Sequence, residues 1–325
     1  MQQQQIPMAE AYYAPLTPGT FTAEVPAFPV VHTQQQQQPQ PQYQQPPNGP
    51  PPAASAPFNE PALRQYLSQH LWPLGLQNVL IASLAQTPVR FFIVDDSGSM
   101  NLDDGQRVIR GPHGARLVKC SRWHELTEAM KFHCELAHVA SAPTEFRLLN
   151  GAAPLKIGAS AFDDATNIGR LTAIFNGSGP DGQTPLCRHV TEVCQQLQHL
   201  APLLSAGGKK ATVVIATDGE ASDGDISIAM RPLHLLPCQV TIRLCTNDDN
   251  VTSYWENVDK NLELRLDIID DLVGEAKEVT QYNGWLTYAE PLQRVREFGV
   301  HIKEFDLIDE KKLSADNMRN FLAIL

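Results

Sequence analysis

The chain has 325 residues, of which 42% are hydrophobic, and its formal net charge is −11 at pH 7. The first 57 residues contain Glu10, Glu24 and no Lys or Arg, so they supply −2 and the rest of the chain about −9. This acidic balance excludes a general nucleic-acid binder, which needs a basic face. No apolar run approaches the ~20 residues of a membrane span, and no secretory signal pattern opens the chain. We therefore expect a cytoplasmic protein.

Residues 1–57 form a segment of biased composition. They hold 13 of the 25 prolines and the glutamine runs Gln2 to Gln5 and Gln34 to Gln38. Such a segment has too little apolar surface to offset the entropy of ordering its backbone. We predict a disordered Gln/Pro-rich tail with polyproline II stretches such as Pro50 to Pro52. The alternative is a docking tract for proline-binding or Gln-rich partners.

All six cysteines follow this tail, and none has CxxC spacing. Several fall inside apolar patterns, as small buried hydrophobes do. We predict reduced thiols rather than a disulfide framework or a zinc site. The six are Cys120, Cys134, Cys187, Cys194, Cys238 and Cys245.

Helix and strand signals alternate after the tail. Residues 59–72 predict a first helix, and the β-rich run 89–94 predicts a buried strand that ends at Asp95. A hairpin is predicted at 106–119, around Gly111-Pro112-His113-Gly114. Ser121 is suited to cap the next helix, whose apolar residues keep near-helical spacing through Ser141.

The middle of the chain combines a hairpin with two long elements. Asn150-Gly151, typical of tight turns, separates the apolar runs 144–149 and 155–157. Thr184-Pro185 then opens an amphipathic helix. The β-branched run 212–216 predicts a central parallel strand.

The last third predicts strands at 239–244 and 300–305, two or three helices within 249–298, and a closing helix at 314–325. This alternation predicts an α/β fold: a doubly wound (Rossmann-like), mostly parallel sheet with one antiparallel edge hairpin and helices on both faces. One domain at 58–325, with its core at about 88–305, accounts for these signals. Helical additions are expected before the core, within it at 249–298, and after it.

Two acidic residues come directly after predicted strands. Asp95 follows the first strand, and Asp218 follows the strand at 212–216. In doubly wound sheets, ligands bind at the carboxyl ends of strands, where the strand order reverses. If these two strands are neighbours, their terminal acids meet in one crevice.

Three short motifs, two directly after predicted strands and one at a predicted helix start, together resemble a known metal-binding site. They are D-x-S-x-S in Asp95-Asp96-Ser97-Gly98-Ser99-Met100, Thr184 in Gly182-Gln183-Thr184-Pro185-Leu186, and Asp218 in Ala216-Thr217-Asp218-Gly219. Together they resemble the metal-ion-dependent adhesion site of von Willebrand factor A (VWA) domains. The alternatives are a polar turn at Ser97 to Ser99, an N-cap at Thr184, and an ordinary strand-end turn at Asp218. Asp96 fills the free position of the motif, where a backbone or turn role is expected.

The resemblance covers residues 88–246 and leaves out the tail. The stretch 264–288, with Ile268-Ile269-Asp270-Asp271 and Gly274-Glu275-Ala276-Lys277, is similar to uncharacterised intracellular VWA proteins of eukaryotic microbes. That similarity brings no assigned activity with it.

The resemblance implies a bound divalent cation. Hydroxyl and carboxylate donors without thiol or imidazole favour Mg²⁺, Mn²⁺ or Ca²⁺ over zinc. Ser97, Ser99 and Thr184 would ligate directly, and Asp95 and Asp218 directly or through water. Mostly neutral direct ligands leave the ion under-neutralised, so it would attract an Asp or Glu from a protein partner.

A basic hairpin follows the motif. Arg107, Arg110, Arg116 and Lys119 are predicted to select an acidic partner by steering. The alternative is a solvated hairpin whose charges pair with Asp103 and Asp104.

Other polar groups have structural interpretations. His133 is predicted to be a packed core histidine. The acids within 249–298 predict a solvated helix face, with a second cation site as the alternative. They are Asp267, Asp270, Asp271, Glu275 and Glu278.

The leading functional prediction is a non-catalytic, metal-dependent protein-interaction module that serves as an adaptor or complex subunit. One alternative is a Mg²⁺-dependent phosphoryl hydrolase with Asp95 as nucleophile, although such enzymes usually show D-x-D and this chain has Ser97 at the third position. Another is a VWA subunit of an ATPase or chelatase-type complex. The sequence leaves the oligomeric state open.

Overall fold

A six-stranded sheet forms the centre of the described chain. The computed structural model describes residues 58–111, 114–151, 153–177, 179–246, 248–262 and 266–325. The predicted disordered tail and the hairpin tip at Pro112 and His113 lie outside these residues. The strand order is β5-β4-β1-β6-β7-β8. The strands are β1 (Val89–Val94), β4 (Thr144–Leu148), β5 (Leu155–Ile157), β6 (Ala211–Thr217), β7 (Cys238–Leu244) and β8 (Leu266–Ile269).

The sheet is parallel except at one edge. β4 and β5 pair antiparallel, with Thr144 opposite Ile157, and the other four pairings are parallel. The predicted α/β fold with one antiparallel edge hairpin is therefore confirmed. The strand order reverses between β1 and β6, because the chain adds β4 on one side of β1 and later β6 on the other.

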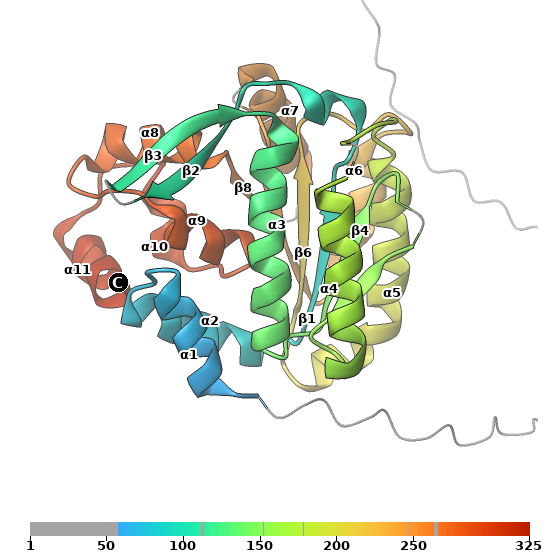
Figure 1. Ribbon diagram of the computed structural model, residues 1–325, viewed down its shortest axis with the longest axis horizontal. Helices are drawn as coiled ribbons and strands as arrows, with labels where there is room; N and C mark the ends of the chain where they lie inside the picture. Colours follow the sequence, from blue (N-terminus) through green and yellow to red (C-terminus); the bar gives the residue numbers. More distant parts are fainter. Residues whose placement is uncertain (1–57, 112–113, 152, 178, 247, 263–265) are drawn as a thin grey trace, which may run out of the picture. The chain divides into compact units, whose positions relative to one another are not determined.

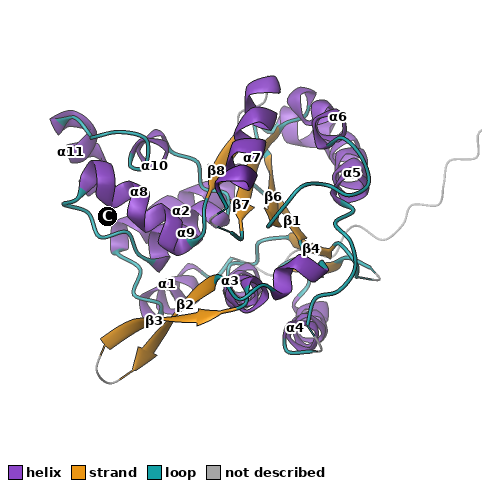
Figure 2. Ribbon diagram, turned by 90° about the horizontal axis from the view of Figure 1, so that it is seen from above, coloured by secondary structure: helices purple, strands orange, loops and turns teal. Residues whose placement is uncertain are grey.

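Helices cover both faces of this sheet (Figures 1 and 2). Phe92 and Val94 of β1 face a core with α3 (Arg122–Val139), α4 (Ala161–Phe175) and α9 (Glu290–Glu297). Phe91 and Ile93 face α5 (Leu186–Ala206), α6 (Ile226–Met230) and α7 (Asp249–Asn261). Successive side chains of a strand point to opposite faces, so an uninterrupted apolar run marks a strand buried on both sides.

The two helices beside the candidate motifs begin in different ways. The Ser121 side chain accepts a hydrogen bond from the His124 N–H and caps α3, as predicted. α5 begins after Pro185 without a side-chain cap. The proposed N-cap role of Thr184 is therefore wrong, because Thr184 lies two residues before the helix.

The C-terminal part differs from the prediction in one strand. The last strand is β8, inside the segment interpreted as helical, while Phe305 belongs to α10 (Lys303–Leu307). The predicted strand at 300–305 is wrong because its apolar residues serve helix packing: the ring of Phe305 lies 6.3 Å from that of Phe321. The helices expected within 249–298 are present as α7, α8 (Leu272–Asn283) and α9, and the chain closes with α11 (Ala315–Ile324).

Short elements complete the fold. α1 (Glu60–Gln69) is the predicted first helix, and α2 (Leu74–Gln86) was not predicted. Two 3₁₀ helices are η1 (Gly98–Asn101) and η2 (Arg231–Leu235). The predicted hairpin forms a separate two-stranded sheet of β2 (Gly105–Gly111) and β3 (Gly114–Cys120). Figure 1 shows it reaching from the start of α3 toward α8.

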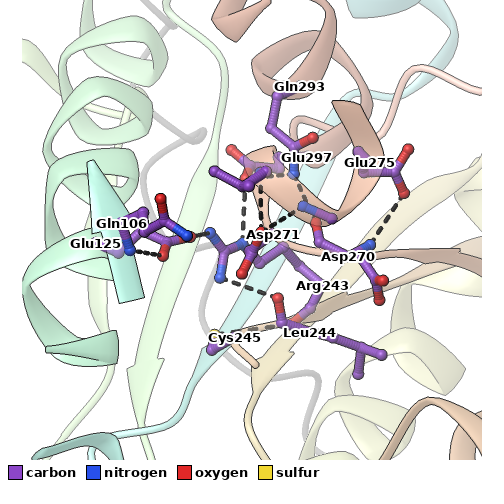
Figure 3. Close-up of polar contacts among 12 residues, drawn as sticks. Gln106, Glu125, Arg243, Leu244, Cys245, Asp270, Asp271, Glu275, Gln293 and Glu297 are labelled. Atoms are coloured by element: carbon purple, nitrogen blue, oxygen red, sulfur yellow. Dashed lines mark hydrogen bonds and ion pairs between the residues drawn. The ribbon is translucent and has the colours of Figure 1, made fainter. Parts of the chain in front are cut away.

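A buried ionic network connects the sheet to α3 and α9. The Arg243 guanidinium donates to Glu125 at 2.5 Å, to Glu297 at 3.3 Å and to the Leu244 carbonyl at 3.0 Å (Figure 3). Glu297 also lies 3.0 Å from His133, which is fully buried, so the predicted core histidine is confirmed. Burial lowers the pKa of His133, and the hydrogen bond and charge of Glu297 oppose this shift.

All six cysteines are free thiols, as predicted. None of the helices in the described parts of the chain combines the length and the apolar character that a membrane crossing requires.

Candidate functional site

The loops after β1 and β6 bring the two predicted acids together. Val94 lies opposite Ala216 in the parallel register, and the Asp95 N–H donates to the Ala216 carbonyl at 2.9 Å. Asp95 and Asp218 therefore lie at the same edge of the sheet, at its topological switch point. The condition on which the crevice prediction depended, that these strands are neighbours, is met.

Asp95 is fully buried. Its Oδ1 accepts the Ser97 N–H at 2.9 Å, and its Oδ2 accepts the Thr217 hydroxyl at 2.6 Å. Burial raises the pKa of Asp95; the hydrogen bonds from Ser97 and Thr217 oppose the shift, and the charge of Asp218 adds to it. No cationic side chain among the described residues forms an ion pair with Asp95, so its charge has no counterion in this part of the chain.

Two serine hydroxyls connect the acids. Ser97 Oγ and Ser99 Oγ are 3.0 Å apart, and Ser99 Oγ donates to Asp218 Oδ1 at 2.9 Å. Ser97 and Asp218 are buried, whereas Ser99 is exposed. The cluster is thus closed toward the core and open toward solvent at Ser99.

The loop before α5 packs on the first loop. The Gly98 N–H donates to the Gly182 carbonyl at 3.1 Å, and the Asp181 N–H donates to the Asp96 carbonyl at 2.9 Å. Gly182 has a φ of +98°, and a Cβ there would lie 2.6 Å from the Asn150 Oδ1. A side chain at Gly182 would therefore collide with Asn150, in the turn after β4.

The backbone of Thr184, in the loop before α5, is held by Ser222, and no hydrogen bond joins Thr184 to the four residues of this cluster. Its N–H donates to Ser222 Oγ at 3.1 Å, and its carbonyl accepts from Ser222 and Leu186 at 2.8 Å. Thr184 Oγ1 makes no hydrogen bond to any residue that the structure describes, and the residue is half-buried. This leaves a hydroxyl available to a ligand, as the resemblance implies.

Asp96 has the structural role that its motif position predicts. Its Oδ1 accepts from the backbone N–H and the side-chain amide of Asn150, at 2.8 and 3.1 Å. Asp96 therefore ties the β1 loop to the turn after β4.

Arg122 also lies at this site, and the sequence did not predict it. Its guanidinium donates to Asp218 Oδ2 at 2.8 Å and to both oxygens of Asp104 at 2.6 Å. Asp104 and Asp218 are separated from Arg122 by 18 and 96 residues. The basic residue after a helix cap is the only local signal, and it does not identify the second partner.

The donors fit a hard cation in composition. Two carboxylates and three hydroxyls supply oxygen atoms alone, which is the chemistry that Mg²⁺, Mn²⁺ or Ca²⁺ requires. No cluster of three or more His, Cys, Asp or Glu suited to a metal occurs among the described residues. The hydroxyls are therefore essential to any cation site here, and Arg122 is the feature that would oppose one.

The basic residues of the hairpin have different surroundings. Arg110 pairs with Glu290 of α9 at 2.5 Å. Arg107 is half-buried, and its Nε is buried without a hydrogen bond. Arg116 and Lys119 are exposed and have no ion pair with a described residue. The predicted alternative, pairing of hairpin cations with Asp103 and Asp104, is wrong because Asp104 pairs with Arg122.

The acids around α8 do not form a simple solvated face. Asp271 caps α8 by accepting from Val273 and Gly274, and Glu275 pairs with Arg296 at 2.5 Å. Asp271 and Glu275 are buried. The helix-face interpretation is wrong for these two, because the helical spacing did not reveal their inward partners.

The chain has only distant similarity to known proteins. No family model matches it, and neither does any curated protein. An aerotolerance-related membrane protein from Bacteroides fragilis is similar in structure, with 13% identity, a TM-score of 0.36, and coverage of 64% of this chain and 98% of that chain. The conserved hypothetical protein BatB from Bacteroides thetaiotaomicron has 12% identity, a TM-score of 0.34, and the same coverages. These similarities are too low to assign a family or a function to the chain.

Proposed function

We propose that the chain is a VWA-type interaction module that binds an acidic protein partner through a divalent cation. The observation that carries this proposal is the convergence of Asp95, Ser97, Ser99 and Asp218, joined through hydrogen bonds of 2.9–3.0 Å, at the switch point of the sheet. All four were singled out from the sequence as parts of an adhesion site.

Each residue has a defined task in this proposal. Ser97, Ser99 and Thr184 would hold the cation directly, and Asp95 and Asp218 directly or through water. A bound cation supplies an open coordination position to a carboxylate of the partner. The chain's own contribution is to fix the donors: Thr217 orients Asp95, and Ser222 positions the backbone of Thr184.

The environment of Asp95 favours binding over catalysis. Both of its carboxylate oxygens accept hydrogen bonds, and the residue is fully buried. A nucleophilic carboxylate needs an oxygen within reach of the substrate. We therefore propose a module without hydrolase activity.

Affinity capture from native lysate tests this proposal. The unaltered chain and Asp95→Ala would each be used as bait, in Mg²⁺ and in EDTA. The proposal expects a partner that the unaltered chain holds only in Mg²⁺ and that Asp95→Ala loses. Identical partners in all conditions would contradict it.

The exposed cations of the hairpin support a role in selecting the partner. Since Arg110 is paired and Arg107 is half-buried, Arg116 and Lys119 are the residues free to steer an acidic protein. Arg116→Glu with Lys119→Glu should slow association at low salt. An unchanged association rate would contradict steering.

A further inference from the structure

The proposed site contains a cation that belongs to the chain itself. Arg122 contacts Asp218 on its inner side and Asp104 on its outer side. The side chains of Arg122 and Asp218 are 9% and 1% exposed, whereas that of Asp104 is 51% exposed. Water screens the outer pair far more than the inner one. The guanidinium charge is therefore felt mainly at Asp218.

The fold anchors this arginine. Arg122 is the first residue of α3, and its backbone N–H donates to the Leu102 carbonyl at 3.0 Å. Gly105 begins β2 against the same point: a Cβ there would lie 2.9 Å from the Ser121 carbonyl oxygen and 3.0 Å from the Arg122 nitrogen. The β2–β3 hairpin therefore begins and ends close to Arg122: β2 starts at Gly105, and β3 ends at Cys120, two residues before Arg122.

An arginine in this position opposes a divalent cation in two ways. Its guanidinium keeps its charge at any ordinary pH, and like charges repel across a few ångströms. It also occupies Asp218 Oδ2, while Ser99 occupies Oδ1. A cation must therefore share both oxygens of Asp218 with donors of the chain.

We propose that Arg122 sets a low affinity of this site for a free divalent cation, so that the cation and a carboxylate bind cooperatively. This inference rests on the proposed function. A carboxylate at the site offsets part of the excess positive charge of the cation and Arg122. Because such coupling is reciprocal, the carboxylate strengthens cation binding as much as the cation strengthens carboxylate binding.

The test is a titration of the full chain with Mn²⁺, in which electron paramagnetic resonance and calorimetry measure the binding. Arg122→Gln removes the charge but keeps a donor for Asp218, and we expect it to bind Mn²⁺ about tenfold more tightly or better. Arg319→Gln, which removes the same charge from the exposed surface of α11, should leave the affinity unchanged. Acetate, as a carboxylate probe, should raise the Mn²⁺ affinity of the unaltered chain more than that of Arg122→Gln.

A second pair of variants avoids the buried position. Asp104→Asn removes the outer partner of Arg122 and should weaken Mn²⁺ binding several-fold, whereas Asp103→Asn, in the same turn, should have a smaller effect. Equal or weaker Mn²⁺ binding by a folded Arg122→Gln, or equal effects of the two Asp→Asn changes, would overturn the inference while the metal site stands. Mn²⁺ binding by Arg122→Gln alone in the absence of acetate, with binding to the unaltered chain restored by acetate, would support the inference. Absence of binding in every variant would overturn the proposed function and this inference together.

Discussion

The chain builds two clusters of charged side chains that differ in how they are neutralised. In the network of Arg243, a buried guanidinium contacts Glu125 and Glu297, and its Nη1 donates to the Leu244 carbonyl. At the carboxyl ends of β1 and β6, Asp95 has only hydroxyl and N–H partners, and Asp218 shares one arginine with Asp104. The first cluster is closed, and the second opens to solvent at Ser99.

This difference separates a structural role from a ligand-binding one. Buried charges that form ion pairs within the chain connect its elements, and they keep no free donor or acceptor for a ligand. Buried charges that keep hydroxyls and an open side retain donor capacity at some cost in stability.

Replacing Arg243 should have the largest effect on stability. Arg243→Met leaves Glu125 and Glu297 buried without their shared cation, and we expect the free energy of unfolding to fall by about 3–5 kcal/mol. Urea denaturation measures the change. Arg319→Met, which removes an arginine with a side-chain exposure of 77% from a surface pair, is the control and should change it by less than about 0.5 kcal/mol. A similar small loss for Arg243→Met would remove the distinction between the two clusters.

Asp270 provides an intermediate case, a half-buried acid with no ion pair among the described residues. Burial, with the charge of Asp271, raises its pKa to about 6. A raised carboxyl pKa means that ionisation disfavours the folded state. The stability that the protonated carboxyl contributes is therefore lost as pH rises from about 4 to about 6. Asp270→Asn should therefore be more stable than the unaltered chain by about 1 kcal/mol at pH 8, with a smaller gap at pH 4.5. Denaturation at both pH values checks this, and a gap that is constant or reversed would contradict it.

The ion pair of the hairpin should contribute least. Arg110 and Glu290 have side-chain exposures of 43% and 25%, so solvent screens their attraction. Arg110→Ala should lower the free energy of unfolding by about 0.5 kcal/mol. A loss above about 2 kcal/mol would show that the hairpin is a structural brace rather than a free surface.

Local patterns predicted most of the sheet and placed Asp95 and Asp218 at strand ends, while the resemblance singled out the other residues of the candidate site. The apolar run before Asp95 and the β-branched run before Asp218 are recognisable because buried parallel strands need such side chains. The strand at 266–269 was missed because it is short and lies beside acids, and the apolar residues at 300–305 were mistaken for it. Whether a short apolar run forms a strand or a helix depends on packing partners that are distant in the sequence.

Pairings over long sequence separations escaped prediction for the same reason. Arg243 finds Glu125 at a separation of 118 residues, and Arg122 finds Asp218 at 96. An arginine carries no sequence signal for which acid it will meet. The resemblance indicated the candidate donors, whereas nothing in the sequence indicated that Arg122 lies beside Asp218.

Equilibrium dialysis against Mn²⁺ tests the central claim most directly. Asp95→Asn keeps the size of the side chain and one acceptor, but removes a buried charge that has no counterion among the described residues. The account predicts one Mn²⁺ per unaltered chain at saturation and none at the same Mn²⁺ concentration for Asp95→Asn, with both proteins folded in circular dichroism. Equal Mn²⁺ content in the two proteins, or none in the unaltered chain even with acetate present, would contradict it.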